Sequence, residues 1–195
     1  MCIDGTTKFD EEREEDYMEA NSNFRVSPTG IMQQFPEIKS INHSLLAKDI
    51  PCLIISVEKN KPGHIRSLHE KICSSAEMEG IKMILYVEHT VDALDLPTAL
   101  WRFCNNLDPK RDQILSRHNS FTQPGKTFAC LGLDGTRKTK ELDNFHRDWP
   151  NIIVADNATI DAVDRKWDAL GLGEFIPSPS HKFKNQMYGA EAVVN

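Results

Sequence analysis

The chain has 195 residues, a hydrophobic fraction of 39% and a net charge of −6. Residues 1–20 carry eight acidic and two basic side chains, so the remaining 175 residues are neutral overall. This balance argues against a basic surface for nucleic acid or for a membrane, and the sequence has no apolar run of the roughly 18 residues that cross a bilayer. The five cysteines include no CxxC pair, which favours reduced thiols and a cytoplasmic protein.

The chain begins with a polar, acidic segment. Residues 1–30 are expected to form a solvated arm or linker, because NSNFRVSPTG at 21–30 is a polar break before the apolar body. Ser27 followed by Pro28 is typical of a helix start, with serine as the cap and proline in the first turn. We expect a short helix here that ends before Pro36.

The body of the chain alternates between strand patterns and helix patterns. The elements we expect are strands at 51–58, 82–88, 127–133 and 151–155, helices at 62–79 and at about 158–170, and a further helix that Asp95 caps and that has Pro97 in its first turn. Buried strands joined by helices predict an α/β fold, a three-layer α/β/α sandwich with a mainly parallel sheet plus N- and C-terminal extensions. We expect residues 31–173 to form this domain and residues 174–195 to form an extended tail.

Several residues with distinctive chemistry are expected inside the protein. Trp101, Trp149 and Trp167 lie on or beside amphipathic segments, which is typical of core residues. Cys130 lies within an apolar strand, so we expect an inert thiol rather than a nucleophile.

Gly125-Lys126-Thr127 imitates the end of a phosphate-binding P-loop. The full motif requires glycine at position 120, where this chain has Ser120, and a helix afterwards, whereas the following FACLGL predicts a strand. This excludes a P-loop triphosphatase, and the lack of a glycine-rich fingerprint makes an independent nucleotide-binding protein the least favoured hypothesis.

Glu88, His89, Asp92 and Asp95 follow the carboxyl end of an expected buried strand, where open α/β sheets usually bind ligands. They would form a metal site only if several converged. The favoured interpretation is that Asp95 caps the next helix while the other three contact loop backbone or face water.

Residues Asp134-Gly135-Thr136-Arg137-Lys138 begin a polar loop after another expected strand. Backbone N–H groups at a strand end, with these side chains nearby, could hold a phosphate or a carboxylate. Alternatively, Asp134 and Thr136 bond within their own turn while Arg137 and Lys138 face solvent.

A series of segments, in this order, resembles the C-terminal domain of the UbiD family of aromatic-acid decarboxylases. The segments are FPEIKSINH (35–43), ISVEKNKPGHIRSL (55–68), YVEHTVDALDLPTALW (86–101), LDPKRD (107–112), GLDGTRK (132–138), and RDWPNI with VDRKWDALGLG within 147–173. The resemblance covers roughly three-quarters of the chain, and its specificity rests on the ordered set.

The resemblance implies a carboxy-lyase that acts on aromatic or unsaturated carboxylic acids with prenylated FMN, a divalent metal and a monovalent cation. In this family the catalytic and metal-binding residues belong to preceding domains, so no catalytic residue and no metal ligand is assigned here. The C-terminal domain helps to close the active site and contributes to assembly. The implied partner is a UbiD-like N-terminal cofactor-binding domain or subunit, with a homo-oligomer expected.

The sequence departs from the family pattern at positions that bear on cofactor contact. Cys130 stands where the family often has a lysine, His89 and Thr90 interrupt an acidic run, and Asn106 replaces a frequent arginine. By resemblance, Lys126 or Lys138 would take over the lysine's role. The candidate cofactor-binding residues are therefore Lys126, Asp134, Thr136 and Lys138.

Two hypotheses follow. The first is a C-terminal capping and oligomerisation domain, or a separate subunit, of a UbiD-like carboxy-lyase that is inactive alone and binds no cofactor alone. The alternative is a non-catalytic α/β binding or assembly module that has lost cofactor contact.

Overall fold

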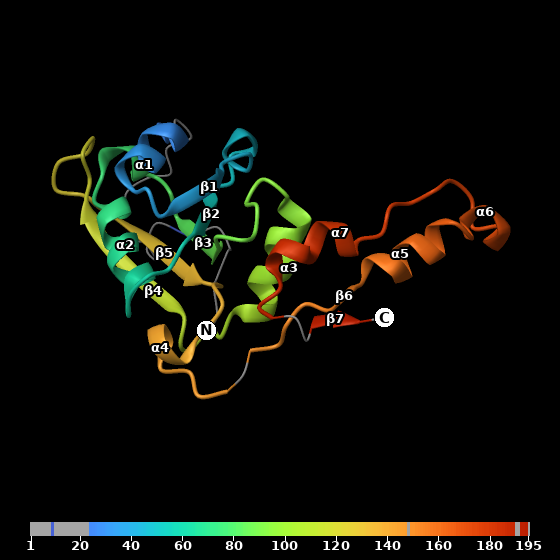
Figure 1. Cartoon of the computed structure of the whole chain (residues 1–195). Helices are drawn as coiled ribbons and strands as arrows, with labels where there is room; N and C mark the ends of the chain where they lie inside the picture. Colours follow the sequence, from blue (N-terminus) through green and yellow to red (C-terminus); the bar gives the residue numbers. More distant parts are fainter. Residues whose placement is uncertain (1–8, 10–23, 148, 190–191, 195) are drawn as a thin grey trace. The chain divides into compact units, whose positions relative to one another are not determined.

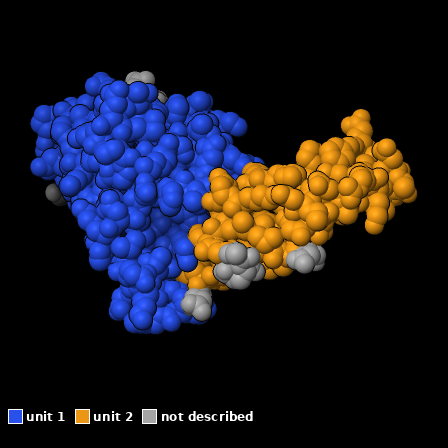
Figure 2. Space-filling view, in the orientation of Figure 1, with its two compact units in different colours: residues 1–147 blue, residues 148–195 orange. Residues whose placement is uncertain are grey.

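The computed structural model describes residues 9, 24–147, 149–189 and 192–194. Most of the expected acidic arm, residues 1–30, lies outside the described residues. The chain forms two compact units, residues 1–147 and residues 148–195 (Figure 2). The boundary between them falls inside the domain expected at 31–173, and the domain division drawn from the sequence, with its tail at 174–195, stays a prediction. Among the described residues, no helix is long and apolar enough to cross a bilayer.

The first unit is built on a five-stranded sheet with the order β1-β2-β3-β5-β4 (Figure 1). The three central strands, β2, β3 and β5, are parallel, whereas β1 and β4 are antiparallel edge strands. The strands span Ile38–Asn42 (β1), Cys52–Val57 (β2), Met83–Glu88 (β3), Gln113–Asn119 (β4) and Thr127–Asp134 (β5). The expected α/β fold with a mainly parallel sheet is confirmed.

Helices cover both faces of this sheet. α1 (Pro28–Gln34) and α2 (His64–Cys73) pack on one face, and α3 (Leu96–Asn106) packs on the other. Neighbouring residues of β2 show the division, because Ile54 belongs to the core under α3 and Ile55 to the core under α2. β2 and β3 are therefore buried on both sides, and β5 is in part, as expected for a three-layer α/β/α arrangement.

The first two helices differ in how well the sequence predicts them. α1 begins and ends where expected, with Ser27 Oγ accepting a hydrogen bond from Gly30 N at 3.2 Å. The helix expected over 62–79 is shorter, because α2 ends at Cys73 and only a short 3-10 helix, η3 (Ala76–Met78), follows. A second short 3-10 helix, η2 (Leu46–Lys48), connects β1 to β2.

The expectation that all three tryptophans are core residues is wrong for Trp101, which is 45% exposed on α3. The inward face of α3 is set by Ala99, Arg102, Phe103 and Asn106, at the spacing of one helical face, and this turns Trp101 outward. Trp149 and Trp167, in the second unit, are only partly buried.

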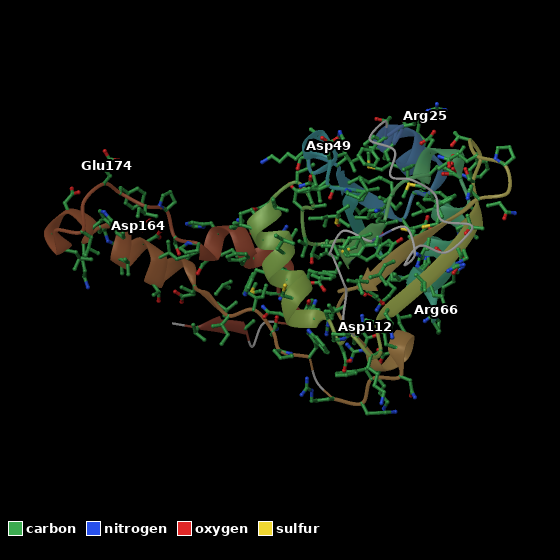
Figure 3. The ribbon with its side chains drawn as sticks, turned by 180° about the vertical axis from the view of Figure 1, so that it is seen from behind. Arg25, Asp49, Arg66, Asp112, Asp164 and Glu174 are labelled. Carbon is green, nitrogen blue, oxygen red and sulfur yellow. The ribbon has the colours of Figure 1, made fainter. Side chains whose placement is uncertain are left out.

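The second unit is small and has few regular elements. They are β6 (Val154–Ala155), α5 (Asn157–Asp164), α6 (Trp167–Leu170), α7 (Ser180–Phe183), η4 (Lys184–Gln186) and β7 (Val193–Val194), which pairs in parallel with β6. Of the strand expected at 151–155, only Val154–Ala155 forms. The helix expected at 158–170 is interrupted after Asp164, and Glu174 lies in the irregular segment beyond α6 (Figure 3).

Candidate functional site

The three parallel strands of the first unit end at the same edge of the sheet, where open α/β sheets usually bind ligands. The register places Val57 of β2 beside Glu88 of β3, and Tyr86 of β3 beside Asp134 of β5. The segments that follow these strands therefore meet at one edge. They form the candidate site, the carboxyl edge.

Glu88 is the buried anchor of the carboxyl edge. Its carboxylate forms an ion pair with Arg102 of α3, and the two side chains are only 8% and 5% exposed. The same carboxylate accepts a hydrogen bond from Arg137 N at 3.0 Å. Charges removed from water to this extent need such partners, so Glu88 fixes the loop after β5 to α3.

The residues after Glu88 make the local contacts that the sequence favoured. Asp92 Oδ1 accepts a hydrogen bond from Leu94 N at 2.9 Å, and Asp95 caps α3 by accepting one from Thr98 N at 3.4 Å. His89 is exposed. The interpretation of this acidic segment as a cap and loop contacts is confirmed.

The loop from Asp134 to Lys138 is folded on itself. Asp134 Oδ1 accepts hydrogen bonds from the backbone N–H of Thr136, at 3.0 Å, and from its hydroxyl. Lys138 Nζ is buried and donates to the carbonyl oxygens of Asp134 at 2.7 Å and Thr136 at 3.0 Å. It also forms ion pairs with the carboxylates of Asp134 at 3.1 Å and Asp112 at 3.5 Å.

These contacts occupy the three N–H bonds of the Lys138 ammonium. As it stands, Lys138 therefore has no N–H left for a flavin phosphate, which would need a donor that has no protein acceptor. A contact between the cofactor and Asp134, Thr136 or Lys138 stays a prediction that requires the loop to rearrange.

Lys59, just after β2, joins the loop to α4 (Lys140–Asp143). Its Nζ donates to Arg137 O at 2.8 Å and to Asp143 Oδ1 at 2.7 Å. Asp143 also accepts a hydrogen bond from Thr139 N at 2.8 Å. Lys59 and Asp143 are 84 positions apart, so no local pattern in the sequence could have predicted the pair.

Asp112, at the end of the LDPKRD turn, brings a further charge to the edge. It is buried, and its carboxylate binds Arg111 Nε at 2.7 Å and accepts a hydrogen bond from Asp108 N at 2.8 Å. With the Lys138 contact, this ties the turn before β4 to the loop after β5.

Gly135 lets the loop approach α3. A Cβ atom at this position would lie 2.4 Å from Phe103 Cδ2, which is closer than side-chain atoms can pack. Asn106 fixes the approach by donating a hydrogen bond from Nδ2 to Gly135 O at 3.1 Å. Asn106, which departs from the family pattern, thus has a structural role here.

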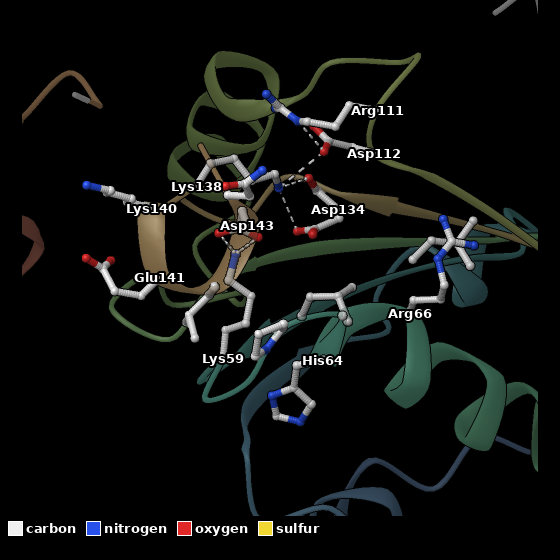
Figure 4. A pocket seen from close by; sticks show the side chains of 16 residues that line it. Lys59, His64, Arg66, Arg111, Asp112, Asp134, Lys138, Lys140, Glu141 and Asp143 are labelled. Carbon is white, nitrogen blue, oxygen red and sulfur yellow. Dashed lines mark hydrogen bonds and ion pairs between the residues drawn. The ribbon is translucent and has the colours of Figure 1, made fainter. Parts of the chain in front are cut away.

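A cavity of about 490 Å³ lies beside these residues (Figure 4). Lys59, Asp112, Asp134, Lys138 and Asp143 line it, and each of these charges is paired with another. Such a wall presents charges of both signs in fixed positions. It suits contact with a polar surface or group better than proton transfer, which needs a group free to change its charge.

His64 lies in the cavity wall at the start of α2, and it is buried and held on both ring nitrogens. Asn60 N donates to Nδ1 at 3.2 Å, which leaves the Nε2–H to face Glu37 Oε1 at 3.2 Å. Burial alone would raise the pKa of Glu37, but its backbone and His64 hydrogen bonds lower that pKa below its ordinary value. His64 is therefore structural.

The structure separates Lys126 from the other candidate residues. Lys126 precedes β5 and Asp134 ends it, so the eight residues of the strand put them roughly 25 Å apart. Cys130, where the family often has a lysine, lies within β5 and is buried in the core on the α2 side. Neither side chain reaches the carboxyl edge.

The sequence matches a family model and resembles proteins of two archaea. Residues 25–124 match the family model described as 3-octaprenyl-4-hydroxybenzoate carboxy-lyase C-terminal domain, UbiD_C. An uncharacterized protein of Aeropyrum pernix is 24% identical over 150 residues, which cover 70% of this chain and 31% of the relative. An uncharacterized protein of Archaeoglobus fulgidus is 25% identical over 142 residues, which cover 69% of this chain and 29% of the relative. The chain thus spans about a third of the length of these relatives.

Solved structures show the same fold. The vanillic acid decarboxylase of Sedimentibacter hydroxybenzoicus in its closed form aligns with a TM-score of 0.52 and 15% identity, over 75% of this chain and 31% of that chain. Its open form aligns with a TM-score of 0.50 and 15% identity, over 73% of this chain and 31% of that chain. At this identity the likeness concerns the fold alone.

Proposed function

The chain belongs to the family of UbiD C-terminal domains, and from this premise we propose that it caps and assembles a UbiD-like carboxy-lyase. It serves either as the C-terminal domain of the enzyme or as a separate subunit. The substrates are aromatic or unsaturated carboxylic acids. The catalytic residues, prenylated FMN and the divalent metal belong to a UbiD-like N-terminal domain or subunit, and the cytoplasm is the proposed location.

The observation that carries this proposal is the pairing of charges at the carboxyl edge. Glu88 is paired with Arg102, Lys59 with Asp143, and Lys138 with two carboxylates. A group that accepts or releases a proton during a reaction must be free to change charge, whereas a cap must keep its shape and exclude water. The paired edge supports the second role.

Assembly is supported by the second unit, which is too small to bury its own apolar side chains. Large apolar residues are exposed along it, namely Ile153, Val163, Leu170, Leu172, Phe175 and Ile176. An exposed apolar surface of this kind is typical of a protein–protein contact. We propose that a homo-oligomer covers it, and sedimentation of the chain as a strict monomer at micromolar concentration would count against this.

The experiment that tests the division of labour compares the chain with its native complex. The tagged chain is purified from its own cells, and bound polypeptides are identified by mass spectrometry. Carbon dioxide release from a panel of aromatic and unsaturated acids is then measured for the complex and for the chain alone, each with prenylated FMN and Mn²⁺. Turnover by a complex that contains a UbiD-like N-terminal polypeptide, and none by the chain, is the expected result. Turnover by the chain alone overturns the proposal.

A second candidate function is a non-catalytic assembly module that has lost cofactor contact. It is favoured because protein acceptors already bind the N–H groups of Lys138, and because Cys130 is buried where the family often has a lysine. The two functions differ in one observable. The module predicts that adding the chain to its partner polypeptide leaves the flavin absorbance spectrum and the rate of carbon dioxide release unchanged, whereas the cap predicts that both change.

A further inference from the structure

A compact group of metal-binding residue types lies inside the first unit, away from the carboxyl edge. His69 and Cys73 are one turn apart on α2, and Cys130 faces them from β5. All three side chains are fully buried. The ring nitrogens and sulfurs that could act as ligands lie within 4.8 Å of one another. Among the described residues, these are the three histidine, cysteine or acidic side chains whose ligand atoms all come this close together.

We propose that His69, Cys73 and Cys130 bind one zinc ion that fastens α2 to the sheet. Zinc in proteins is held by cysteine sulfur at about 2.3 Å and histidine nitrogen at about 2.0 Å in a tetrahedral arrangement, which separates a sulfur from a nitrogen ligand by roughly 3.5 Å. The distance from Cys73 Sγ to His69 Nε2 is 3.6 Å. The side chains therefore already have the separation of two zinc ligands.

The contacts of His69 favour Nε2 over Nδ1 as the nitrogen that would bind the metal. Nδ1 lies 3.0 Å from the hydroxyl of Tyr86, which is fully buried. A metal-binding histidine commonly donates its second N–H to such a partner, and this fixes the ring and its tautomer. Nε2 lies 3.6 Å from Cys73 Sγ, against 3.8 Å for Nδ1, and has Ser116 Oγ at 3.1 Å and the Cys130 carbonyl oxygen at 3.3 Å. Ser116 is the candidate for the fourth ligand.

The sheet is shaped to receive the imidazole. Gly132, two residues after Cys130 on β5, lies under the ring, and a Cβ atom there would stand 2.6 Å from His69 Nδ1. Only glycine admits the ring this close to the strand. The position of His69 against β5 is thus specified by the sequence of both elements.

The charge of the site selects a divalent ion. Two thiolates and a neutral imidazole around Zn²⁺ give a site with no net charge, which an apolar core tolerates, whereas Cu⁺ with the same ligands leaves a negative charge. On binding, Zn²⁺ replaces the thiol protons of Cys73 and Cys130, and these protons go to solvent. Because the site is closed, the ion enters as the chain folds. No redox step is involved.

The bound ion would cross-link two parts of the chain that are distant in sequence. His69 and Cys130 are 61 positions apart, and the ion would join the helix before β3 to the strand after β4. Structural zinc sites contribute to folding in this way. The role is independent of the proposed function, since it concerns the core under α2 and not the carboxyl edge.

The experiment refolds the untagged full-length chain from guanidinium with a chelator and a phosphine reductant, and then without chelator in the presence of Zn²⁺, Co²⁺ or no metal. The proposal predicts about one zinc per chain by elemental analysis. It predicts a higher Tm with zinc, and a thiolate-to-cobalt charge-transfer band with the visible bands of a tetrahedral site. Refolding without metal to the same Tm and near-ultraviolet circular dichroism, with no cobalt band, overturns it.

Cysteine variants assign the ligands. Cys130→Ser should lose about half of the charge-transfer intensity, because one of the two thiolates is removed. Cys104→Ser, which changes an exposed thiol, and Cys2→Ser should keep the full band. A full band in Cys130→Ser, or its loss in either control, contradicts the assignment. If Cys130→Ser does not fold, the refolding of the unaltered chain decides by itself.

Discussion

Arg102 of α3 and Glu88 at the end of β3 form a buried ion pair that fixes the helix to the carboxyl edge of the sheet. The pair joins one of the covering layers to the sheet at the point where the loop after β5 also binds. Its disruption should therefore affect both the stability of the fold and the shape of the proposed cap.

Replacing Arg102 tests this directly. Arg102→Met leaves the Glu88 carboxylate buried without its ion-pair partner, so the free energy of unfolding should fall by about 3–5 kcal/mol. The control is Lys39→Met, which removes the exposed ion pair with Glu58 and should cost less than about 1 kcal/mol. Urea unfolding followed by circular dichroism measures both, and equal losses would show that the buried pair has no special role.

The loop after β5 offers a second test. Lys138→Met removes the ammonium that neutralises Asp134 and Asp112, and should lower the free energy of unfolding by about 3 kcal/mol or more. Lys140→Met, at an exposed position in the wall of the same cavity, should change it by less than about 0.5 kcal/mol. A neutral result for Lys138→Met would indicate that this lysine is held for binding rather than for structure.

The close approach of Gly135 to α3 predicts an unusual sensitivity to one methyl group. Gly135→Ala should lower the free energy of unfolding by about 1–3 kcal/mol, because the new Cβ overlaps Phe103. Combining it with Phe103→Leu should restore part of the loss, so the double variant should be less destabilised than the two single changes predict together. Simple additivity in thermal unfolding would mean that the two residues do not collide.

The buried cysteines predict a pattern of alkylation. Burial raises the pKa of the Cys52 thiol from 9.0 to about 11, so this thiol stays protonated and unreactive at pH 8. Iodoacetamide should therefore modify the exposed Cys104 before Cys52, as peptide mapping by mass spectrometry would show. Rapid labelling of Cys52 in the folded chain would contradict its burial.

The same shift sets a pH dependence with a definite sign. Because the folded state holds the Cys52 proton more tightly than the unfolded state, its contribution to stability is fully present below about pH 9 and is lost as the pH rises through about 11. Thermal unfolding across this range should therefore show a smaller alkaline loss in Cys52→Ala than in the unaltered chain. Equal losses would mean that this thiol is not responsible.

The sequence predicted the central strands because apolar runs such as CLIISV are long, β-branched and bounded by turns. It missed β4, whose QILSRHN alternates between polar and apolar residues as an edge strand does, with one face covered and the other exposed. Helix starts at Ser27 and Asp95 were predicted because capping is a local interaction. Helix ends were less well predicted, since α2 ends at Cys73 and not at residue 79. The inward face of α3, which leaves Trp101 outside, was also not predicted.

The candidate site was predictable only in part, for a different physical reason. The loop from Asp134 to Lys138 was found because it follows a strand and has turn chemistry, but nothing local showed that its lysine would be buried between two carboxylates. Lys126 was grouped with it although a whole strand lies between them. The pairing of Lys59 with Asp143 depends on tertiary contacts alone.

The most direct test of the account is the release of labelled carbon dioxide from carboxyl-labelled aromatic acids by the full chain alone, supplied with prenylated FMN and Mn²⁺. We expect no release above the rate without protein, and release once the native partner polypeptide is added. Sustained release by the isolated chain would contradict the claim that its proposed role is to cap and assemble the enzyme while decarboxylation occurs on another domain.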